Sequence, residues 1–373
     1  MRFWQVHHEF KFSAAPAYTG VIFNYGVAIM NCFSTNLIEI IGYQIEKVHS
    51  GILAWLINSK NTQIPIEKKV DLINKISSKK IDSYPDTIKT YLEWAKGRSI
   101  KVDLVIECKY ENVTKVLGLE FKVDSIPNKE QLEITERILK KEYRDADIEV
   151  ILVLMGVSAK ATRDCDVGKY KIIRLNDFLS YLDDVHIQNI EIWKEAIEAE
   201  LQRHKKILAE IQKSDSIWSL KEELIDKGYR WPFPVFYLLY AILRDDFLKS
   251  NDWAIYSGSN NPVMNAKDSW KEIDGVDIYV EFCWESLFIK CGNWDLKKDK
   301  DWIKRLRENV YQEMRERMGS EVERCQNRYG KSNSLCKISF NFAKTPFEKI
   351  AEKTKRFLSE YLTIVEAIEA KVK

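Results

Sequence analysis

Three charged residues lie in apolar, strand-like stretches of this sequence: Asp103, Glu120 and Lys122. Side chains alternate between the two faces of a β-strand, so Glu120 and Lys122 of the run VLGLEFK project to one face and Phe121 to the other. Asp103 lies in the apolar run KVDLVI, where a carboxylate is costly unless it is paired or bound to a cation. Charged groups held in this way can do chemistry.

Two of these residues are expected to meet. If the strands Ile100–Tyr110 and Lys115–Lys122 form a hairpin through the turn ENVT, Asp103 and Glu120 lie at the same end of the sheet. Adjacent carboxylates repel, and one takes up a proton unless a cation neutralises them. Mg²⁺ suits the pair because it binds one or two carboxylates and keeps several waters, and Mn²⁺ is the alternative ion. Lys122 could then orient a water or stabilise charge on a phosphate.

Two further residues could complete such a site. Gln131 opens the helix that follows Pro127, and its amide could hold a water or a substrate phosphate. Glu46 lies just before the dense apolar part of the first long helix, from which it could reach the sheet. For both residues, an exposed helix position without a role is the alternative. His49 is expected to be a packing or surface histidine rather than a base.

A second Glu-x-Lys pair, Glu107 and Lys109, competes with Glu120 and Lys122. It lies on the same strand as Asp103, so the three side chains would follow one strand rather than converge from neighbouring strands. No helix with a glutamine follows it directly. We therefore favour Glu120 and Lys122.

In this order and on these elements, Glu46, Asp103, Glu120-x-Lys122 and Gln131 resemble the PD-(D/E)XK nuclease superfamily, over roughly residues 40–180. The resemblance implies a restriction-endonuclease-like αβββαβ core and a metal-dependent phosphodiesterase site. It implies catalytic roles for Asp103, Glu120, Lys122 and Gln131, with Asp103, Glu120 and Glu46 as metal ligands. The proline that usually precedes the first acid is replaced by Val102.

The resemblance also sets the expected function. It implies a DNA endonuclease or exonuclease that hydrolyses a phosphodiester through metal-activated water. The stretch EKVHSGILAWLIN resembles the opening helix of one prokaryotic branch, which implies a role in defence or in mobile elements. The alternatives are a non-cleaving module that binds nucleic acid or a protein partner, and a structural protein in which Glu120 and Lys122 form a surface-facing ion pair.

The elements that must position these residues follow from hydrophobic periodicity. In the first part of the chain we predict these strands and helices: strands Thr87–Trp94, Ile100–Tyr110, Lys115–Lys122, Glu149–Met155 and Tyr170–Arg174; helices Asn36–Asn58, Ile66–Ser77, Asn128–Tyr143, Asn176–Leu182 and Ile187–Lys213. A short helix is the alternative for Thr87–Trp94. The fold class predicted is therefore α/β, with a mixed sheet.

A C-terminal α+β domain is predicted to follow. Its predicted elements are helices Pro234–Phe247, Asp301–Met318 and Phe347–Ala370, strands Trp253–Tyr256 and Cys336–Phe342, and a hairpin across Val276–Cys291. The stretch YSGSNNPV is interpreted as a plain turn, and the basic helix as a solvated face. The predicted domains are 1–29 as an extension or an edge strand, 30–185 as the nuclease-like domain, 186–215 as a linking helix, and 216–373. The last could recognise the target, regulate activity or form a homodimer or partner contact.

Composition limits the class of protein. The 373 residues are 45% apolar and 31% charged with a net charge of +2, which excludes a disordered or fibrous chain and provides no global field for a polyanion. Seven scattered cysteines without a CxxC pair favour reduced thiols in a cytoplasm over disulfides or zinc. No apolar run has transmembrane length, and the first residues lack the features of a signal peptide. Membrane is therefore not an expected partner.

Overall fold

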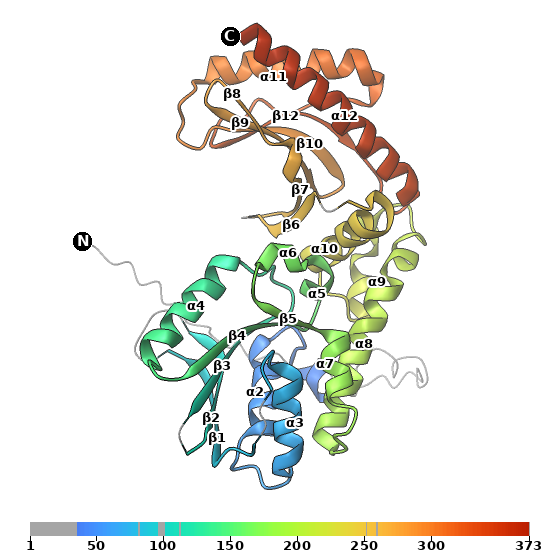
Figure 1. The fold of residues 1–373 in the computed structure, drawn as a ribbon. Helices are drawn as coiled ribbons and strands as arrows, with labels where there is room; N and C mark the ends of the chain where they lie inside the picture. Colours follow the sequence, from blue (N-terminus) through green and yellow to red (C-terminus); the bar gives the residue numbers. More distant parts are fainter. Residues whose placement is uncertain are drawn as a thin grey trace, which may run out of the picture. The chain divides into compact units, whose positions relative to one another are not determined.

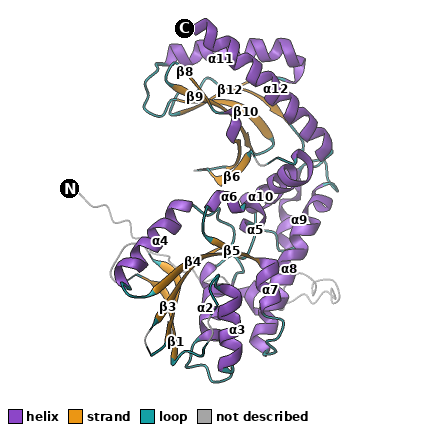
Figure 2. Cartoon of the chain, in the orientation of Figure 1, coloured by secondary structure: helices purple, strands orange, loops and turns teal. Residues whose placement is uncertain are grey.

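The computed structural model describes residues 36–80, 83–95, 101–111, 113–250, 252–258 and 260–372. The chain divides into Met1–Ser34 and Thr35–Lys373, and every described residue belongs to the second unit. The predicted extension 1–29 lies outside the described residues. The second unit is a mixed α/β structure that contains two sheets (Figure 1, Figure 2).

The first sheet has five strands in the order β1-β2-β3-β4-β5. They are β1 Thr87–Trp94, β2 Val102–Lys109, β3 Thr114–Lys122, β4 Asp147–Leu154 and β5 Lys171–Arg174. β1, β2 and β3 are antiparallel, whereas β3, β4 and β5 are parallel. The short turn after β2 allows only an antiparallel return, and helix α4 (Lys129–Glu142) supplies the crossover that parallel β4 requires. The prediction of a mixed sheet is confirmed, and Thr87–Trp94 is a strand rather than a helix.

Helices cover both faces of this sheet (Figure 1). On one face, α4 packs Leu132 and Leu139 against Val105 and Val116. The opposite face packs against α2 (Glu46–Ile57), α7 (Leu175–Tyr181) and α8 (Gln188–Ile211). Gly118 of β3 lies directly under α4, because a Cβ atom there would overlap the end of the Leu139 side chain. The missing side chain therefore lets α4 approach the strand that carries Glu120.

The predicted helix over Asn36–Asn58 is wrong in one respect, because the chain breaks between α1 (Leu37–Ile41) and α2 (Glu46–Ile57). Gly42 stands between them with a φ of 120°, which helical backbone cannot adopt. Tyr43 then turns inward, and its buried hydroxyl donates to the Met155 carbonyl at 2.6 Å. The continuous apolar periodicity hid this break. Helix α3 (Ile66–Ile76) forms where it was predicted.

Helix α8 contributes to two cores. Trp193 and Ile197 in its first half pack into the core of the first sheet, and Ile207 and Ile211 in its last turns pack into the core of the second. The short helices α5 (Ser158–Ala161) and α6 (Asp164–Val167) lie between β4 and β5. The long helix predicted over Ile187–Lys213 is confirmed.

The second sheet has seven strands and is antiparallel in every pairing, in the order β11-β12-β10-β9-β7-β6 with β8 paired to β9. Its strands are β6 Trp253–Ser257, β7 Pro262–Ala266, β8 Lys271–Ile273, β9 Val276–Cys283, β10 Ser286–Gly292, β11 Glu323–Arg324 and β12 Ser332–Ser339. The sequence did not predict β7, β8 or β11, which are short. The YSGSNNPV stretch contains the end of β6 and the start of β7, which pair with each other in antiparallel fashion.

The remaining helices follow α8 in the chain. They are α9 Lys221–Asp226, α10 Phe233–Ile242 with a π-helical extension Leu243–Leu248, α11 Lys300–Met318, α12 Phe347–Val372, and 3₁₀ turns at Ile217–Leu220, Lys267–Ser269 and Gly319–Glu321. The basic helix α11 is not simply a solvated face, because Arg307 is buried and donates to the carbonyls of Ser334 and Arg328. In the described part of the chain, no helix is both long enough and apolar enough to cross a membrane.

Candidate functional site

The register of β2 and β3 brings two acids face to face. Leu104 is paired with Leu119, and one step further along the same register Asp103 lies opposite Glu120. An Asp103 carboxylate oxygen accepts a hydrogen bond from the Phe121 backbone N–H at 2.8 Å. The hairpin therefore places both carboxyl groups at the same end of the sheet.

Glu120 is almost completely buried, with 1% of its surface exposed. Its Oε2 accepts from Gln131 Nε2 at 3.0 Å, and its Oε1 accepts from Thr135 Oγ1 at 2.8 Å. Burial, and after it the nearby Asp103 charge, together raise the pKa of Glu120 to about 8. Without a cation, Glu120 is therefore largely protonated at neutral pH.

Lys122 has a different acidic partner. Its Nζ donates to the Phe121 carbonyl at 2.9 Å and lies 3.5 Å from Glu46 Oε2, at the start of α2. Glu46 also accepts from the Ser125 hydroxyl at 3.0 Å. The structure thus places Glu46 beside Lys122, and no hydrogen bond links Glu46 to the two facing carboxyl groups.

The structure brings Asp103, Glu120 and Gln131 together and places Lys122 two residues along the same strand. The alternative of a surface-facing Glu120–Lys122 ion pair is wrong, because both side chains are buried and Lys122 pairs with Glu46. Thr135 was not predicted. It lies four residues after Gln131, so both side chains share one helix face, and this spacing was the only signal in the sequence.

The donor set fits a hard divalent cation held by two carboxylates. No group of three or more His, Cys, Asp or Glu side chains suited to a metal exists among the residues that the structure describes. Mg²⁺ does not need one, because it commonly uses one or two carboxylates and completes its shell with water. The raised pKa of Glu120 is the supporting observation, since a cation beside the pair would offset both the burial and the Asp103 charge that keep this carboxyl protonated.

The second Glu-x-Lys pair forms an ordinary ion pair. Glu107 Oε1 lies 3.4 Å from Lys109 Nζ, and the Tyr91 hydroxyl lies 3.4 Å from Glu107 Oε2. Glu107 lies four residues along β2 from Asp103, towards the other end of the strand. These contacts give it partners of its own, away from Glu120.

His49 is a packing histidine, as predicted. It is fully buried on α2, where its Nδ1 accepts from Trp193 Nε1 at 3.0 Å. The other ring nitrogen, Nε2, therefore carries the proton and donates to the Tyr43 carbonyl at 2.7 Å. Burial lowers the pKa of His49 to about 4, so the ring is neutral at physiological pH.

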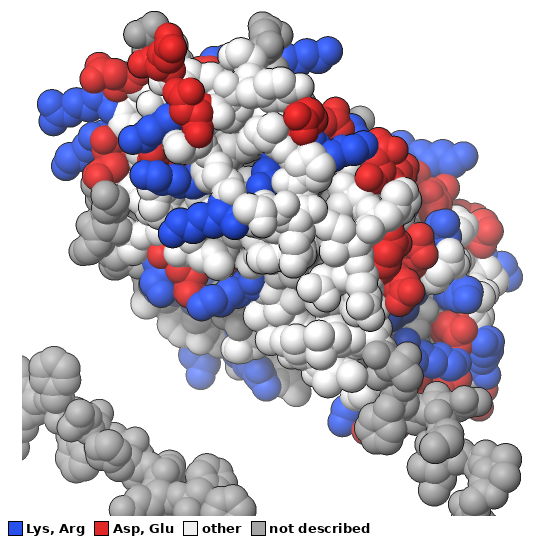
Figure 3. Space-filling model, turned by 90° about the horizontal axis from the view of Figure 1, so that it is seen from below, with Lys and Arg blue, Asp and Glu red and all other residues white. Residues whose placement is uncertain are grey.

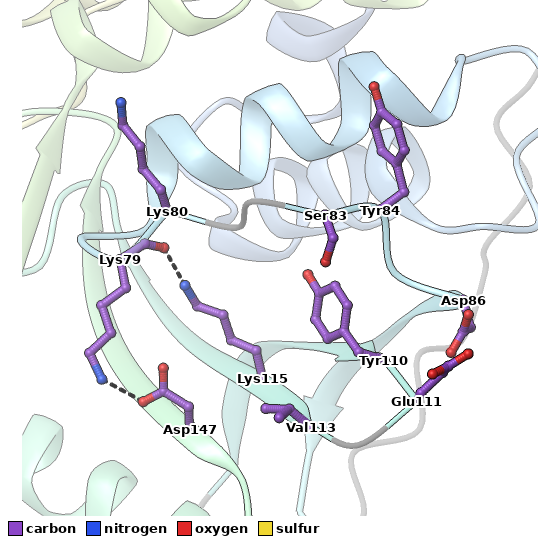
Figure 4. A pocket seen from close by; sticks show the side chains of 10 residues that line it. All are labelled: Lys79, Lys80, Ser83, Tyr84, Asp86, Tyr110, Glu111, Val113, Lys115 and Asp147. Carbon is purple, nitrogen blue, oxygen red and sulfur yellow. Dashed lines mark hydrogen bonds and ion pairs between the residues drawn. The ribbon is translucent and has the colours of Figure 1, made fainter.

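A cavity of about 680 Å³ lies at the opposite end of the first sheet (Figure 4). Its lining comes from the segment between α3 and β1, from the turn after β2 and from the starts of β3 and β4, whereas Glu120 is near the end of β3. Lys79 Nζ pairs with Asp147 at 2.5 Å, and Lys115 Nζ donates to the Lys79 carbonyl. Because these lysines already have acceptors, the cavity offers little uncompensated positive charge.

On the face drawn in Figure 3, the described residues form no broad basic track. Figure 3 shows Lys and Arg interspersed with Asp and Glu on the described part of the face that it presents. This agrees with the small net charge of the chain. Any contact with a phosphate must therefore depend on local groups.

No protein-family model, no curated protein and no solved structure matches this chain.

Proposed function

We propose that this protein is a metal-dependent phosphodiesterase that cleaves DNA, on a restriction-endonuclease-like core. The observation that carries the proposal is the buried Glu120 carboxyl facing Asp103, with its pKa raised to about 8. A buried carboxyl facing a second, partly exposed acid is costly to ionise, and binding a divalent cation is the simplest reason for a protein to maintain the two together.

The order of elements supports the same reading. Helix α2 precedes the antiparallel strands β1, β2 and β3, and α4 leads to the parallel strand β4. Asp103 lies on the second strand, Glu120 and Lys122 on the third, and Gln131 on the helix that follows. These are the positions that the family resemblance implies for the site residues.

Each side chain then has a defined task. Asp103 and Glu120 would hold Mg²⁺, which supplies a water of lowered pKa and offsets charge on the phosphate. The Gln131 amide and the Thr135 hydroxyl fix both oxygens of Glu120. The Lys122 ammonium is held by the Phe121 carbonyl and by Glu46, and its remaining donor can reach a phosphate oxygen or the attacking water.

A cleavage assay with Mg²⁺ or Mn²⁺ tests the proposal. Asp103→Asn and Lys122→Met should each lower the rate of DNA cleavage by about 100-fold or more, which is typical for loss of a charge-stabilising group. Lys109→Met is the matched control, because it removes the lysine of the second Glu-x-Lys pair and should leave the rate unchanged. Equal cutting by all three variants and the unmodified protein would contradict the assignment.

The second candidate is a module that binds nucleic acid or a protein partner without cleaving. The observation in its favour is that Glu46 pairs with Lys122, so the two facing carboxyl groups are not joined by a third acid. Under this reading, DNA binds but no condition produces cleavage. A Mg²⁺-dependent rise in the melting temperature that Asp103→Asn removes and Glu46→Gln retains would argue for the metal site and against this candidate.

A further inference from the structure

A second cavity, of about 280 Å³, lies beyond the ends of β4 and β5. Its charged lining residues are mainly basic: Lys160, Arg163, Arg174, His204, Arg244 and Asp245. Thr162, Leu175 and Asn176 also contribute to its wall. None of these residues belongs to the Asp103–Glu120 pair, so the cavity is a separate feature of the molecule.

Thr162 provides an independent sign that a ligand is missing. The residue is only 3% exposed, yet its hydroxyl oxygen has no hydrogen-bond partner among the described residues. A buried hydroxyl without a partner is unfavourable, and such groups in native proteins call for an explanation. A ligand atom that accepts a hydrogen bond from the Thr162 hydroxyl would provide this explanation.

The wall of the cavity around Thr162 contains several hydrogen-bond donors and few free acceptors. Arg244 donates to the carbonyls of Lys160 and Ala161 at 3.0 and 2.9 Å, and Arg174 donates to the Thr162 carbonyl at 3.0 Å. Three consecutive carbonyls are therefore already occupied by guanidinium groups. Thr162 and Arg174 both line the cavity, so a ligand that enters here lies beside this threonine and the remaining donors of Arg174.

The acids near the cavity compensate this charge only in part. Asp245 pairs with Arg244 at 2.6 Å, and Asp164 pairs with Arg174 at 2.8 Å. Asp166 accepts from Arg163 at 3.4 Å and is shared with Lys267 at 3.0 Å. His204 is held by Glu200. Lys160 has no acidic partner within the described part of the chain, and it lines the cavity.

We propose that this cavity binds a phosphate group, recognised by the Thr162 hydroxyl, Arg174 and Lys160. Phosphate suits the site because it is rich in acceptor oxygens and forms strong bonds to guanidinium and ammonium groups. The phosphate can come from a free nucleotide or from a nucleic-acid chain, and the chemistry at the site is the same. The inference does not depend on the proposed cleavage activity.

Thr162→Val is the decisive variant. It removes only a hydroxyl that makes no bond in the free protein, so the melting temperature should stay the same or rise. Calorimetric titration of the full chain with inorganic phosphate and with pyrophosphate should show binding about tenfold weaker than in the unmodified protein, since a hydrogen bond to a charged group is lost. Arg174→Gln and Lys160→Ala should weaken binding further. Lys205→Ala, an exposed lysine on α8, is the control and should bind as the unmodified protein does.

The source of the phosphate is resolved by a second titration. Oligonucleotides with a 5′-phosphate and with a 5′-hydroxyl are compared with a nucleoside triphosphate, each against the unmodified protein and Thr162→Val. The proposal is supported if a phosphate-bearing probe binds, if Thr162→Val and Arg174→Gln weaken that binding, and if Lys205→Ala does not. The probe that behaves in this way identifies the source of the phosphate. Binding that is equal in Thr162→Val and the unmodified protein, or no binding of any of these probes, overturns it.

Discussion

At the scale of single residues, the molecule holds titratable groups where water cannot stabilise their charge. Glu120 is kept protonated by burial and by Asp103, and His49 is kept neutral by burial between Tyr43 and Trp193. The sequence indicated that Glu120 and Lys122 share a strand face. It could not show that Lys122 takes Glu46 as its partner, because that contact joins residues 76 positions apart.

Buried His49 should make the protein less stable in acid. Its pKa is about 4 in the folded protein and about 6.5 in the unfolded chain, so the unfolded state binds the proton first as the pH falls. The free energy of unfolding should therefore be unaffected by this group above pH 6.5 and should decrease between pH 6.5 and 4, by up to about 3 kcal/mol.

Urea unfolding at a series of pH values measures this effect. Glu120 changes the free energy of unfolding over an overlapping pH range and in the opposite direction, because its raised pKa adds stability at low pH that is lost as the pH rises from 4.5 to about 8. The comparison is therefore made against His49→Gln, which keeps a donor and an acceptor but does not titrate. If both proteins lose the same free energy between pH 6.5 and 4, His49 is not the group responsible.

At the scale of elements, the position of α4 depends on one residue of β3. Gly118 lies under Leu139, and the same helix carries the two side chains that hold the Glu120 carboxyl. Packing at this point therefore determines where Gln131 and Thr135 stand. A helix that shifts away from the sheet would release both oxygens of Glu120.

Gly118→Ala should reduce the free energy of unfolding by about 1–3 kcal/mol, the usual cost of overpacking a core. Combining it with Leu139→Ala should recover part of the cost of Gly118→Ala, because the overlapping atoms are removed. Gly51→Ala, within α2, is the matched control: a Cβ atom there meets nothing within 4 Å, so this variant should be unchanged or more stable. Denaturant titrations of the unmodified protein, the three single variants and the double variant measure the effect, and a Gly118→Ala protein as stable as the Gly51→Ala protein would contradict it.

The sequence predicted long elements well and short ones poorly. The strands of the first sheet have clear alternation or long apolar runs, and they form within about two residues of the predicted bounds. The break at Gly42 was missed because the apolar spacing continues through it. β8 and β11 have three and two residues, too few to establish a period. Tertiary pairing, rather than local propensity, determines such strands.

At the scale of the whole described unit, α8 joins two hydrophobic cores. An ionic cluster at its centre links Asp124, just after β3, to Arg230, just before α10. Glu200 is 1% exposed and accepts two hydrogen bonds from Arg230, which also donates to Asp124 at 2.5 Å. Although burial alone would raise the pKa of Glu200, Arg230 and His204 hold it well below its usual value. The sequence of α8 is rich in charged residues, and nothing in that pattern marks Glu200 as a buried one.

Arg230→Met should therefore be strongly destabilising, by about 3 kcal/mol, because it leaves Glu200 and Asp124 as buried carboxylates without this cation. Lys227→Met provides the control, since Lys227 makes only exposed ion pairs with Glu210 and Glu223 and its loss should cost less than about 1 kcal/mol. Thermal unfolding followed by circular dichroism compares the two variants. Similar losses in both would show that the buried cluster adds nothing beyond a surface ion pair.

The shared helix has a consequence for how this protein can be divided. At 1.5 Å per residue, the 24 residues of α8 form a rod of about 36 Å. A gene fragment that stops before it would encode a first sheet without Trp193 and Ile197, and one that starts after it would lack Ile207 and Ile211. Neither half carries a complete interior of its own. Recombination that exchanged one sheet for another would have to keep this helix with both, so the two halves are expected to be inherited together.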